Sequence, residues 1–306
     1  MVFIYITNNK VDLIWRGNAF ASGIYGFYTN NFDMVGNTVR ASDYGAYFFN
    51  SGQPFANTQR NSIVNNMLFS DADNGLYLYY IDSTDIFHNT VASNSTSLSA
   101  VRLFNLGANS VSGYDMRNNV FYSNGTYALE TNIPDNVMFS TMDYNNYYTS
   151  GTSLLRINSV DYANLGAYTT ASPSFNANSL EGDPQFLNYP LDLHILGALV
   201  NDAGDNTVGV LVDIDGDVRP ASGSTVVDMG ADEYTPPSCP PPTSVSFTNI
   251  AITTADINFV GGVGSSWEYE YGVSGFVQGT GQLDTATTTT DIISGLTSGT
   301  PYDVYV

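Results

Sequence analysis

Short segments in which apolar and polar residues alternate fill the first half of the chain, and no run of helical periodicity lasts beyond a turn or two. A period of two is typical of β-strands that bury one face. One frame recurs in paraphrase: DIFHNTVAS at 85–93 returns as DMRNNVFYS at 115–123. A single strand-rich unit has no partner for its apolar face, so such units are stable only when they stack at about 4.8 Å. The pattern therefore predicts an all-β repeat protein.

An asparagine anchors each copy of this repeat. Six copies align on Asn18, Asn37, Asn66, Asn89, Asn119 and Asn146, which are 19 to 30 residues apart. The position two residues later is bulky (Phe20, Val39, Leu68, Val91, Phe121, Tyr148), and the position four residues later is small (Ser22, Ala41, Ser70, Ser93, Ser123, Ser150). Asparagine tolerates turn conformations, and stacked asparagine amides pass hydrogen bonds from one coil to the next. We therefore predict a structural ladder of these six side chains, with the variation in coil length confined to loops.

These columns resemble the repeats of the pectate-lyase-like superfamily across roughly residues 12–150. The resemblance implies a right-handed parallel β-helix with repeats over about 12–160, and it implies a fold rather than an activity. The opening MVFIYITNNK predicts a strand and not a secretion signal, because it has no basic start and no cleavage-site pattern. The chain is therefore expected to be part of a longer multidomain protein whose signal segment lies elsewhere.

The sequence pattern changes after the repeats. The segments EGDPQFLNYPLDLHILGALVNDAGDN (181–206), DIDGDVRP (213–220) and VVDMGADEY (226–234) resemble, in this order, the closing segment of secreted bacterial β-helix proteins. An open coil end exposes strand edges and needs a cover. We therefore expect a cap at about 180–234 that completes a β-helix domain of residues 1–234. Four residues are assigned to this cap: His194, Arg219, Asp228 and Glu233. A buried ion pair between Arg219 and an acidic residue is favoured over catalysis.

The C-terminal quarter predicts a second domain. TPPSCPPPTS (235–244) is typical of an extended, semi-rigid linker. Residues 245–306 contain short alternating strands separated by turn residues. The last segment, GLTSGTPYDVYV, resembles a fibronectin type III module, which implies a β-sandwich with Leu296 and Tyr302 in its core. The final strand of that fold is missing from the sequence, so a truncated sandwich is expected.

The net charge of the chain limits the classes of partner that it can bind. The 306 residues contain 8 Lys and Arg against 29 Asp and Glu, which gives a net charge of −21. Nucleic acid and anionic membranes are repelled by such a chain, and no apolar run approaches the roughly 18 residues of a membrane span. One cysteine rules out an internal disulfide framework. The texture, rich in Asn, Ser, Thr, Gly and Tyr, indicates a secreted or cell-surface bacterial protein.

Candidate catalytic residues are few. A lyase on a β-helix needs an Arg or Lys base beside carboxylates that hold Ca²⁺, and a hydrolase needs clustered Asp residues. The sequence shows no paired-Asp hydrolase signature. The candidates are His88, beside its ladder asparagine, with Asp85, Asp115 and Arg102. They define an alternative function as a polysaccharide lyase or glycoside hydrolase fragment that acts on the outer face of the β-helix.

One metal site is considered. Asp213, Asp215 and Asp217 alternate through DIDGD, with a glycine that permits a sharp turn. Oxygen ligands at alternate positions suit Ca²⁺, although the Glu that closes an EF-hand is missing. DADNG at 71–75 is a weaker version of the same pattern. No other cofactor is expected.

The aromatic residues suggest a binding surface. GIYGFY, GAYFFN and GLYLYY align on their glycines, which stacks Tyr25, Tyr47 and Tyr77 in one column and Phe27, Phe49 and Tyr79 in another. If the columns point outward, they form a strip on which sugars bind. The expected exposure of Arg102 and Glu130 in later coils instead suggests the opposite parity, in which case the columns are core or are covered by long loops. The leading hypothesis is a non-catalytic module for adhesion or for binding a polysaccharide or cell-surface glycan.

Overall fold

The computed structural model describes residues 4–13, 21–28, 31–50, 60–105, 113–234, 242–260 and 266–306. The chain divides into two compact units, Met1–Tyr234 and Thr235–Val306. Helix within the described ranges is confined to α1 (Asp135–Met138), α2 (Leu165–Ala171) and the 3-10 turn η1 (Asn206–Val208). The described chain is therefore all-β, as the alternating pattern predicts.

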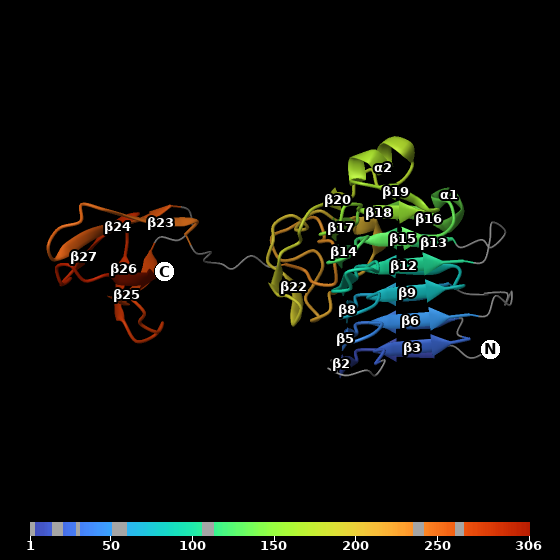
Figure 1. Cartoon of the computed structure of the whole chain (residues 1–306), viewed down its shortest axis with the longest axis horizontal. Coiled ribbons are helices and arrows are strands. Elements are labelled where there is room, and N and C mark those ends of the chain that lie inside the picture. The colour runs from blue at the N-terminus through green and yellow to red at the C-terminus, as the bar shows by residue number, and fades with distance from the viewer. Residues whose placement is uncertain are drawn as a thin grey trace. The chain divides into compact units, whose positions relative to one another are not determined.

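The first unit is a parallel β-solenoid built from three sheets (Figure 1). The first sheet contains β1 (Ile4–Thr7), β4 (Phe32–Val35), β7 (Asn61–Val64), β10 (Thr84–Phe87), β13 (Tyr114–Arg117) and β16 (Phe139–Asp143). The second contains β2 (Lys10–Leu13), β5 (Thr38–Ala41), β8 (Met67–Ser70), β11 (Thr90–Ser93), β14 (Val120–Ser123), β17 (Asn146–Thr149) and β20 (Leu180–Glu181). The third contains β3 (Ile24–Phe27), β6 (Ala46–Phe49), β9 (Leu76–Tyr79), β12 (Val101–Phe104), β15 (Leu129–Thr131), β18 (Leu155–Ile157) and the antiparallel β19 (Val160–Tyr162). Each coil gives one strand to each sheet, and the predicted parallel β-helix is confirmed.

Alternate residues of every sheet fill the interior of the solenoid. On the first sheet the inward column contains the buried Met34, Ile63, Ile86, Met116 and Met142. Phe32 and Phe48 stack inside the same core, with ring centroids 4.2 Å apart. Because the inward residues are apolar on all three sheets, one continuous core runs through the stacked coils.

An asparagine ladder runs along the corner between the first and second sheets. Asn66 Nδ2 donates to Asn89 Oδ1 at 2.9 Å, and the same oxygen accepts the backbone N–H of Asn66 at 3.0 Å. Asn66 Nδ2 also donates to the Met34 carbonyl in the coil before. The same pattern joins Asn37 to Asn66 and Asn89 to Asn119. Each amide therefore satisfies backbone and side-chain groups that the corner would otherwise bury unpaired.

The ends of this ladder differ from the prediction. In the last coil Asn119 donates to Asn145 Oδ1 at 2.8 Å, so the prediction of Asn146 is wrong by one residue. The register explains the error, because Val120 pairs with Asn146, which is already the first residue of β17. At the other end Asn9, which the prediction omitted, donates to Asn37 at 2.9 Å. The predicted anchor Asn18 lies outside the described residues.

The residue before each ladder asparagine adopts a left-handed conformation. The column contains Asn8, Gly36, Asn65, His88, Asn118 and Tyr144, all with φ between 52° and 69°. Glycine and asparagine accept this conformation at the lowest cost. This requirement explains why Gly and Asn dominate the column, and it makes His88 and Tyr144 the strained members.

The segment predicted to cap the coils lies along their side. Residues 183–234, here named the lateral cover, pack on the outer face of the second sheet, where Leu193 and Ala231 contact Met67, Phe69 and Ala92. Its only described strands are β21 (Phe186–Asn188) and β22 (Asp192–Ile195), which form a hairpin. Figure 1 shows this yellow to orange segment beside β14 and β8.

Helix α2 instead occupies the C-terminal end of the coils (Figure 1). Its Leu165 and Tyr168 are buried in the core of the solenoid. The Tyr168 hydroxyl also donates to Asp135 Oδ2 at 2.9 Å. The prediction that residues 180–234 cap the end of the coils is therefore wrong. Helix α2 covers that end, and the lateral cover instead buries outward residues of the second sheet, such as Met67 and Phe69.

The second unit contains two antiparallel sheets of three strands each. One sheet contains β23 (Ser244–Thr248), β24 (Thr254–Val260) and β27 (Thr290–Ser294), and the other contains β26 (Gln282–Ala286), β25 (Trp267–Val273) and β28 (Tyr302–Tyr305). A small core lies between them and includes Ile257, Tyr269 and Ile293. Leu296 and Tyr302 are partly buried against this core.

Candidate functional site: an aromatic strip on the third sheet

The outer face of the third sheet has two aromatic columns. Pairing of β3 with β6 and of β6 with β9 places Tyr25, Tyr47 and Tyr77 in one column. The same pairings place Phe27, Phe49 and Tyr79 in the second column. The residues between the two columns, such as Phe48 and Leu78, are buried in the solenoid. These six aromatic residues, here named the aromatic strip, therefore project outward and are not core.

The later coils keep the same parity. Arg102 pairs directly with Tyr77, and Glu130 pairs with Arg102, so both continue the first column. The expectation that the aromatic residues have the opposite parity is wrong. It placed Arg102 and Glu130 out of phase with the tyrosine column, whereas the register places them in that same column, so their exposure indicates that the tyrosines face outward.

Most rings of the strip stack on each other. The Tyr47 and Tyr77 rings lie 4.9 Å apart at 13°, and those of Phe49 and Tyr79 lie 5.2 Å apart at 13°. Rings stacked in this way cover each other's faces and leave their edges toward solvent. Tyr25 differs, because its ring is turned by 77° from Tyr47 and is 56% exposed. The strip thus offers ring edges and hydroxyls, with a largely exposed ring at its first coil.

Tyr44 widens the strip at one corner. Its ring stacks on Tyr47 at 4.8 Å and lies 5.9 Å from Tyr77. Burial raises the pKa of the Tyr44 hydroxyl, and the nearby carboxylates of Asp73 and Asp43 raise it further. Burial also raises the pKa of Asp73, which shares a hydrogen bond with Tyr44. Sequence reasoning missed Tyr44, although it directly precedes the glycine of GAYFFN on which the columns were aligned.

Arg102 marks the end of the aromatic part of the first column. Its guanidinium lies 4.0 Å from the ring centroid of Phe104 and 5.3 Å from that of Tyr77. Its Nε lies 3.4 Å from Glu130 Oε2. Cation–π contacts on two rings hold the planar guanidinium in place. Beyond it the column is charged, since Arg156 pairs with Glu130 across the strands.

The four candidate catalytic residues do not come together. Asp85 and Asp115 are neighbours on the first sheet, and Arg60 and Arg117 neutralise them at 2.6 and 2.7 Å. Arg102 lies on the third sheet. His88 is 1% exposed at the corner under the lateral cover. The predicted constellation is therefore wrong, because strands on different sheets of the solenoid face different directions.

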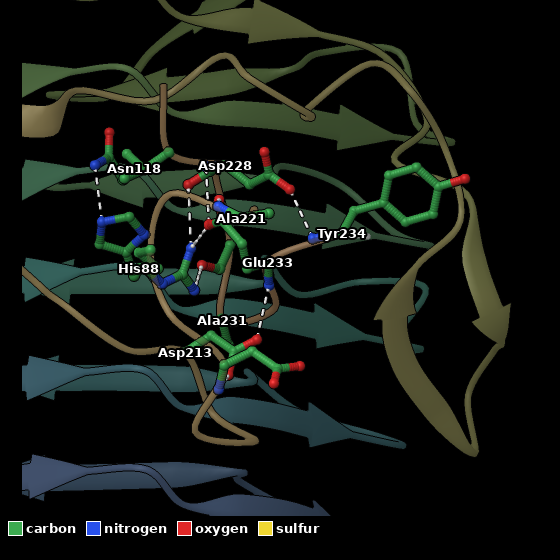
Figure 2. Close-up of polar contacts among 12 residues, drawn as sticks. His88, Asn118, Asp213, Ala221, Asp228, Ala231, Glu233 and Tyr234 are labelled. Carbon is green, nitrogen blue, oxygen red and sulfur yellow. Dashed lines mark hydrogen bonds and ion pairs between the residues drawn. The ribbon is translucent and has the colours of Figure 1, made fainter. Parts of the chain in front are cut away.

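His88 belongs to a buried network that anchors the lateral cover (Figure 2). Its Nε2 lies 2.9 Å from Asn118 Nδ2, so it accepts from that amide. Burial lowers the pKa of His88 well below its usual value, and the charge of Arg219 adds to this effect. The ring is therefore a neutral structural group and not an exposed base.

The expected ion pair of the C-terminal segment is present. Arg219 NH1 donates to Glu233 Oε2 at 2.8 Å, and both side chains are at most 1% exposed. Asp228 accepts the backbone N–H groups of Asp202 and Tyr234 at 2.6 and 2.7 Å. Burial raises the pKa of Asp228 to about 7. Figure 2 shows Asp228 and Glu233 close together in this network. The buried ion pair and these hydrogen bonds lie within the lateral cover, which is the arrangement expected of structural groups.

The predicted Ca²⁺ ligands diverge. Asp213 Oδ1 accepts the backbone N–H groups of Asp215 and Asp217 at 2.9 and 2.8 Å, which closes a turn. Within the described ranges, the group of three metal-binding side chains with ligand atoms within 4.8 Å is His194, Asp215 and Asp232. Both ring nitrogens of His194 already face carboxylates, those of Asp192 and Asp215. Burial lowers the pKa of His194, but the contacts with these carboxylates outweigh that effect and raise the pKa above its usual value. The arrangement is thus a satisfied ion cluster around a histidine.

Comparisons with protein-family models, with curated proteins and with solved structures find no match. No helix in the described parts of the chain is long and apolar enough to cross a bilayer. The class of the protein therefore follows from its own structure: a parallel β-solenoid with one laterally covered face and one aromatic face.

Proposed function

We propose that the chain is a non-catalytic module of a large secreted or cell-surface protein. In this proposal the module binds polysaccharide through the aromatic strip, and this binding contributes to adhesion. The observation that carries this proposal is the pair of outward aromatic columns on the third sheet. Soluble proteins rarely leave a contiguous aromatic surface without a partner. Tyrosine suits a sugar ligand because it combines an apolar ring with a hydroxyl.

The repeat geometry supports a polymeric ligand. Every coil presents the same pair of outward positions, and successive rings of the strip are 4.9 to 5.2 Å apart. An extended polymer therefore meets an equivalent set of contacts at each coil, so weak contacts add along its length. The rigid stacking of the coils fixes these contacts before binding, which lowers the entropic cost of association.

A catalytic role has less support. The lyase or hydrolase alternative required His88, Arg102 and a carboxylate in one groove, and these groups lie on separate faces. Asp85 and Asp115 each already hold an arginine. A general base must reach its proton within hydrogen-bond distance, and this set offers no such position.

The modular layout agrees with a surface protein. The resemblance of the repeats to pectate-lyase-like β-helices and of the second unit to fibronectin type III modules both suggest secreted multidomain proteins. The two three-stranded antiparallel sheets of the second unit support the latter resemblance. In this proposal the second unit is a spacer, and the solenoid is the binding part.

Retention on immobilised polysaccharides tests the proposal. The wild-type chain, the double variant Tyr47→Ala/Tyr77→Ala and the control Tyr5→Ala are passed over the same columns. Tyr5 is a 70% exposed tyrosine on the first sheet and matches the chemistry of the change on another face. We expect retention of wild type and Tyr5→Ala, loss of retention for the double variant, and no release of sugar products. Failure of every polysaccharide to retain the wild-type chain contradicts the proposal.

A further inference from the structure

The carboxylates around the aromatic strip distinguish between two classes of polysaccharide. Asp73 bonds to Tyr44, whose ring stacks on Tyr47, and Asp43 lies close enough to raise the pKa of the same hydroxyl. Glu130 lies at the far end of the first column. Among the described residues, the cation that contacts the strip is Arg102, and Glu130 already pairs with it. The immediate surroundings of the strip are therefore net negative, in a chain whose net charge is −21.

The hydroxyl groups of Tyr47 and Tyr77 remain uncharged at physiological pH. Burial raises the pKa of Tyr77 to about 12 and also raises that of Tyr47. The hydroxyls of Tyr79 and Tyr80 lie 3.2 Å apart and form a hydrogen bond with each other. A tyrosine hydroxyl both donates and accepts, as does a sugar hydroxyl. The polar part of the strip is thus complementary to a ligand rich in hydroxyl groups, and the surrounding carboxylates disfavour a negatively charged one.

The columns also define a direction. Their residues are in register from coil to coil, so each column runs along the axis of the solenoid. A chain bound along this axis contacts a new ring on every coil. A chain bound across it meets only two outward residues of a four-residue strand before the corner. The axial direction therefore gives the larger number of contacts.

Arg102 supplies a fixed polar group where the aromatic rings end. Its guanidinium is held on Phe104 and Tyr77 and lies beside Glu130. The Arg102 side chain is 27% exposed. A pre-positioned guanidinium donates to sugar oxygens at little entropic cost. We infer that the strip binds an uncharged, hydroxyl-rich polysaccharide that lies along the solenoid axis, with Arg102 as a positioning residue at the end of the rings. This inference rests on the proposed function.

Matched polymers that differ in charge test the inference with the whole chain. One pair is hydroxyethyl cellulose and carboxymethyl cellulose, and a second is methyl-esterified and de-esterified pectin. Affinity electrophoresis measures the retardation in each gel at low and at high salt. We expect the neutral member of a retarding pair to bind at least about fivefold more tightly at low salt. The gap should narrow at high salt, because salt screens repulsion between exposed charges.

Charge variants test whether repulsion by Asp43 and Asp73, and not non-specific binding, causes the preference for neutral polymers. Asp43→Asn/Asp73→Asn should raise the affinity for the anionic polymers severalfold and leave the neutral affinity unchanged. Asp256→Asn/Asp284→Asn, which changes the net charge equally in the second unit, should alter neither. Arg102→Gln should weaken neutral binding severalfold, and Arg102→Lys should restore part of it.

The outcomes distinguish the two proposals. Preference for the anionic polymers, abolished in the Tyr47→Ala/Tyr77→Ala variant, overturns the inference and leaves polysaccharide binding by the strip intact. Absence of retardation by any polymer removes the proposed function, and the inference with it. Equal binding of both members of each pair at low salt also overturns the inference, because repulsion by Asp43 and Asp73 then has no effect.

Discussion

Two faces of the same solenoid carry large aromatic residues, and only one of them has a partner within the described chain. On the second sheet, Phe69 and Tyr122 point outward and are covered by Phe186, Tyr189 and Leu193 of the lateral cover. On the third sheet, the aromatic strip points outward, and its first members Tyr25 and Phe27 are 56% and 51% exposed.

The difference shows what an aromatic sheet face requires. The covered face is closed by apolar residues and secured by a buried ion pair, so its aromatic residues contribute to stability. The rings of the strip cover each other's faces by stacking, which leaves their edges and hydroxyls for a ligand. The comparison predicts that equivalent substitutions affect stability on one face and binding on the other.

Breaking the anchor of the lateral cover should have the largest effect. Arg219→Met leaves Glu233 buried without its partner, so we expect the free energy of unfolding to fall by about 3 to 5 kcal/mol. Chemical denaturation measures the loss. Arg156→Met is the control, since its ion pair with Asp161 is exposed, and it should cost less than about 1 kcal/mol. Equal effects of the two variants contradict a structural role for the buried pair.

Truncating one aromatic residue on each face tests the difference between the two faces directly. Phe69→Ala removes a ring that is 1% exposed and should cost about 3 to 5 kcal/mol. Tyr47→Ala removes only stacking contacts and should cost about 1 to 2 kcal/mol. Thermal unfolding and polysaccharide retention are measured on the same samples. A Tyr47→Ala variant as unstable as Phe69→Ala indicates that the strip is structural.

The corner that joins the first sheet to the covered face offers a matched pair of asparagines. Asn89→Ala removes a ladder amide and leaves its backbone partners unpaired, which should cost about 1 to 3 kcal/mol. Asn146→Ala removes an amide whose two polar atoms are buried and make no hydrogen bond within the described residues, so it should be neutral or slightly stabilising. Denaturant titrations of both variants compare them, and a larger loss for Asn146→Ala refutes the ladder as described.

Protonation of His88 should give the smallest effect when the pH is lowered by only about one unit below 6.5. Its folded pKa is depressed, so below the unfolded value of 6.5 the unfolded chain binds a proton that the folded chain does not. Stability contributed by the neutral ring is thus lost as the pH falls below 6.5, by up to about 1.4 kcal/mol per pH unit. The free energy of unfolding of His88→Asn does not have this pH dependence. The difference between the variant and the wild type should therefore shift in favour of the variant by this amount as the pH falls. A difference that is constant with pH contradicts a buried neutral ring.

The repeated part of the fold was predictable because its rule is local. Alternation and the asparagine column identify strands and corners without knowledge of the rest of the chain. The Asn145–Asn146 pair defeats this rule, since either residue fits the column, and only the cross-strand register assigns the ladder to Asn145. Asn9 was missed for a related reason, because its coil was aligned on Asn18 instead.

The candidate sites depend on contacts that no local rule contains. Arg117 reaches Asp205 across 88 positions of sequence, and Asn65 donates to Val212 across 147. Such contacts decide that the lateral cover lies on a side of the solenoid and that His88 is buried. The aromatic strip was visible in the sequence because its columns repeat, whereas its outward direction required the register.

The proposed function requires the aromatic strip to be the ligand-binding face. Hydroxyl-radical footprinting with mass spectrometry, with and without a neutral polysaccharide, reports the accessibility of individual tyrosines. We predict that Tyr25, Tyr47 and Tyr77 become protected while Tyr5 on the first sheet does not. Protection confined to other faces, or none at saturating polysaccharide, would contradict it.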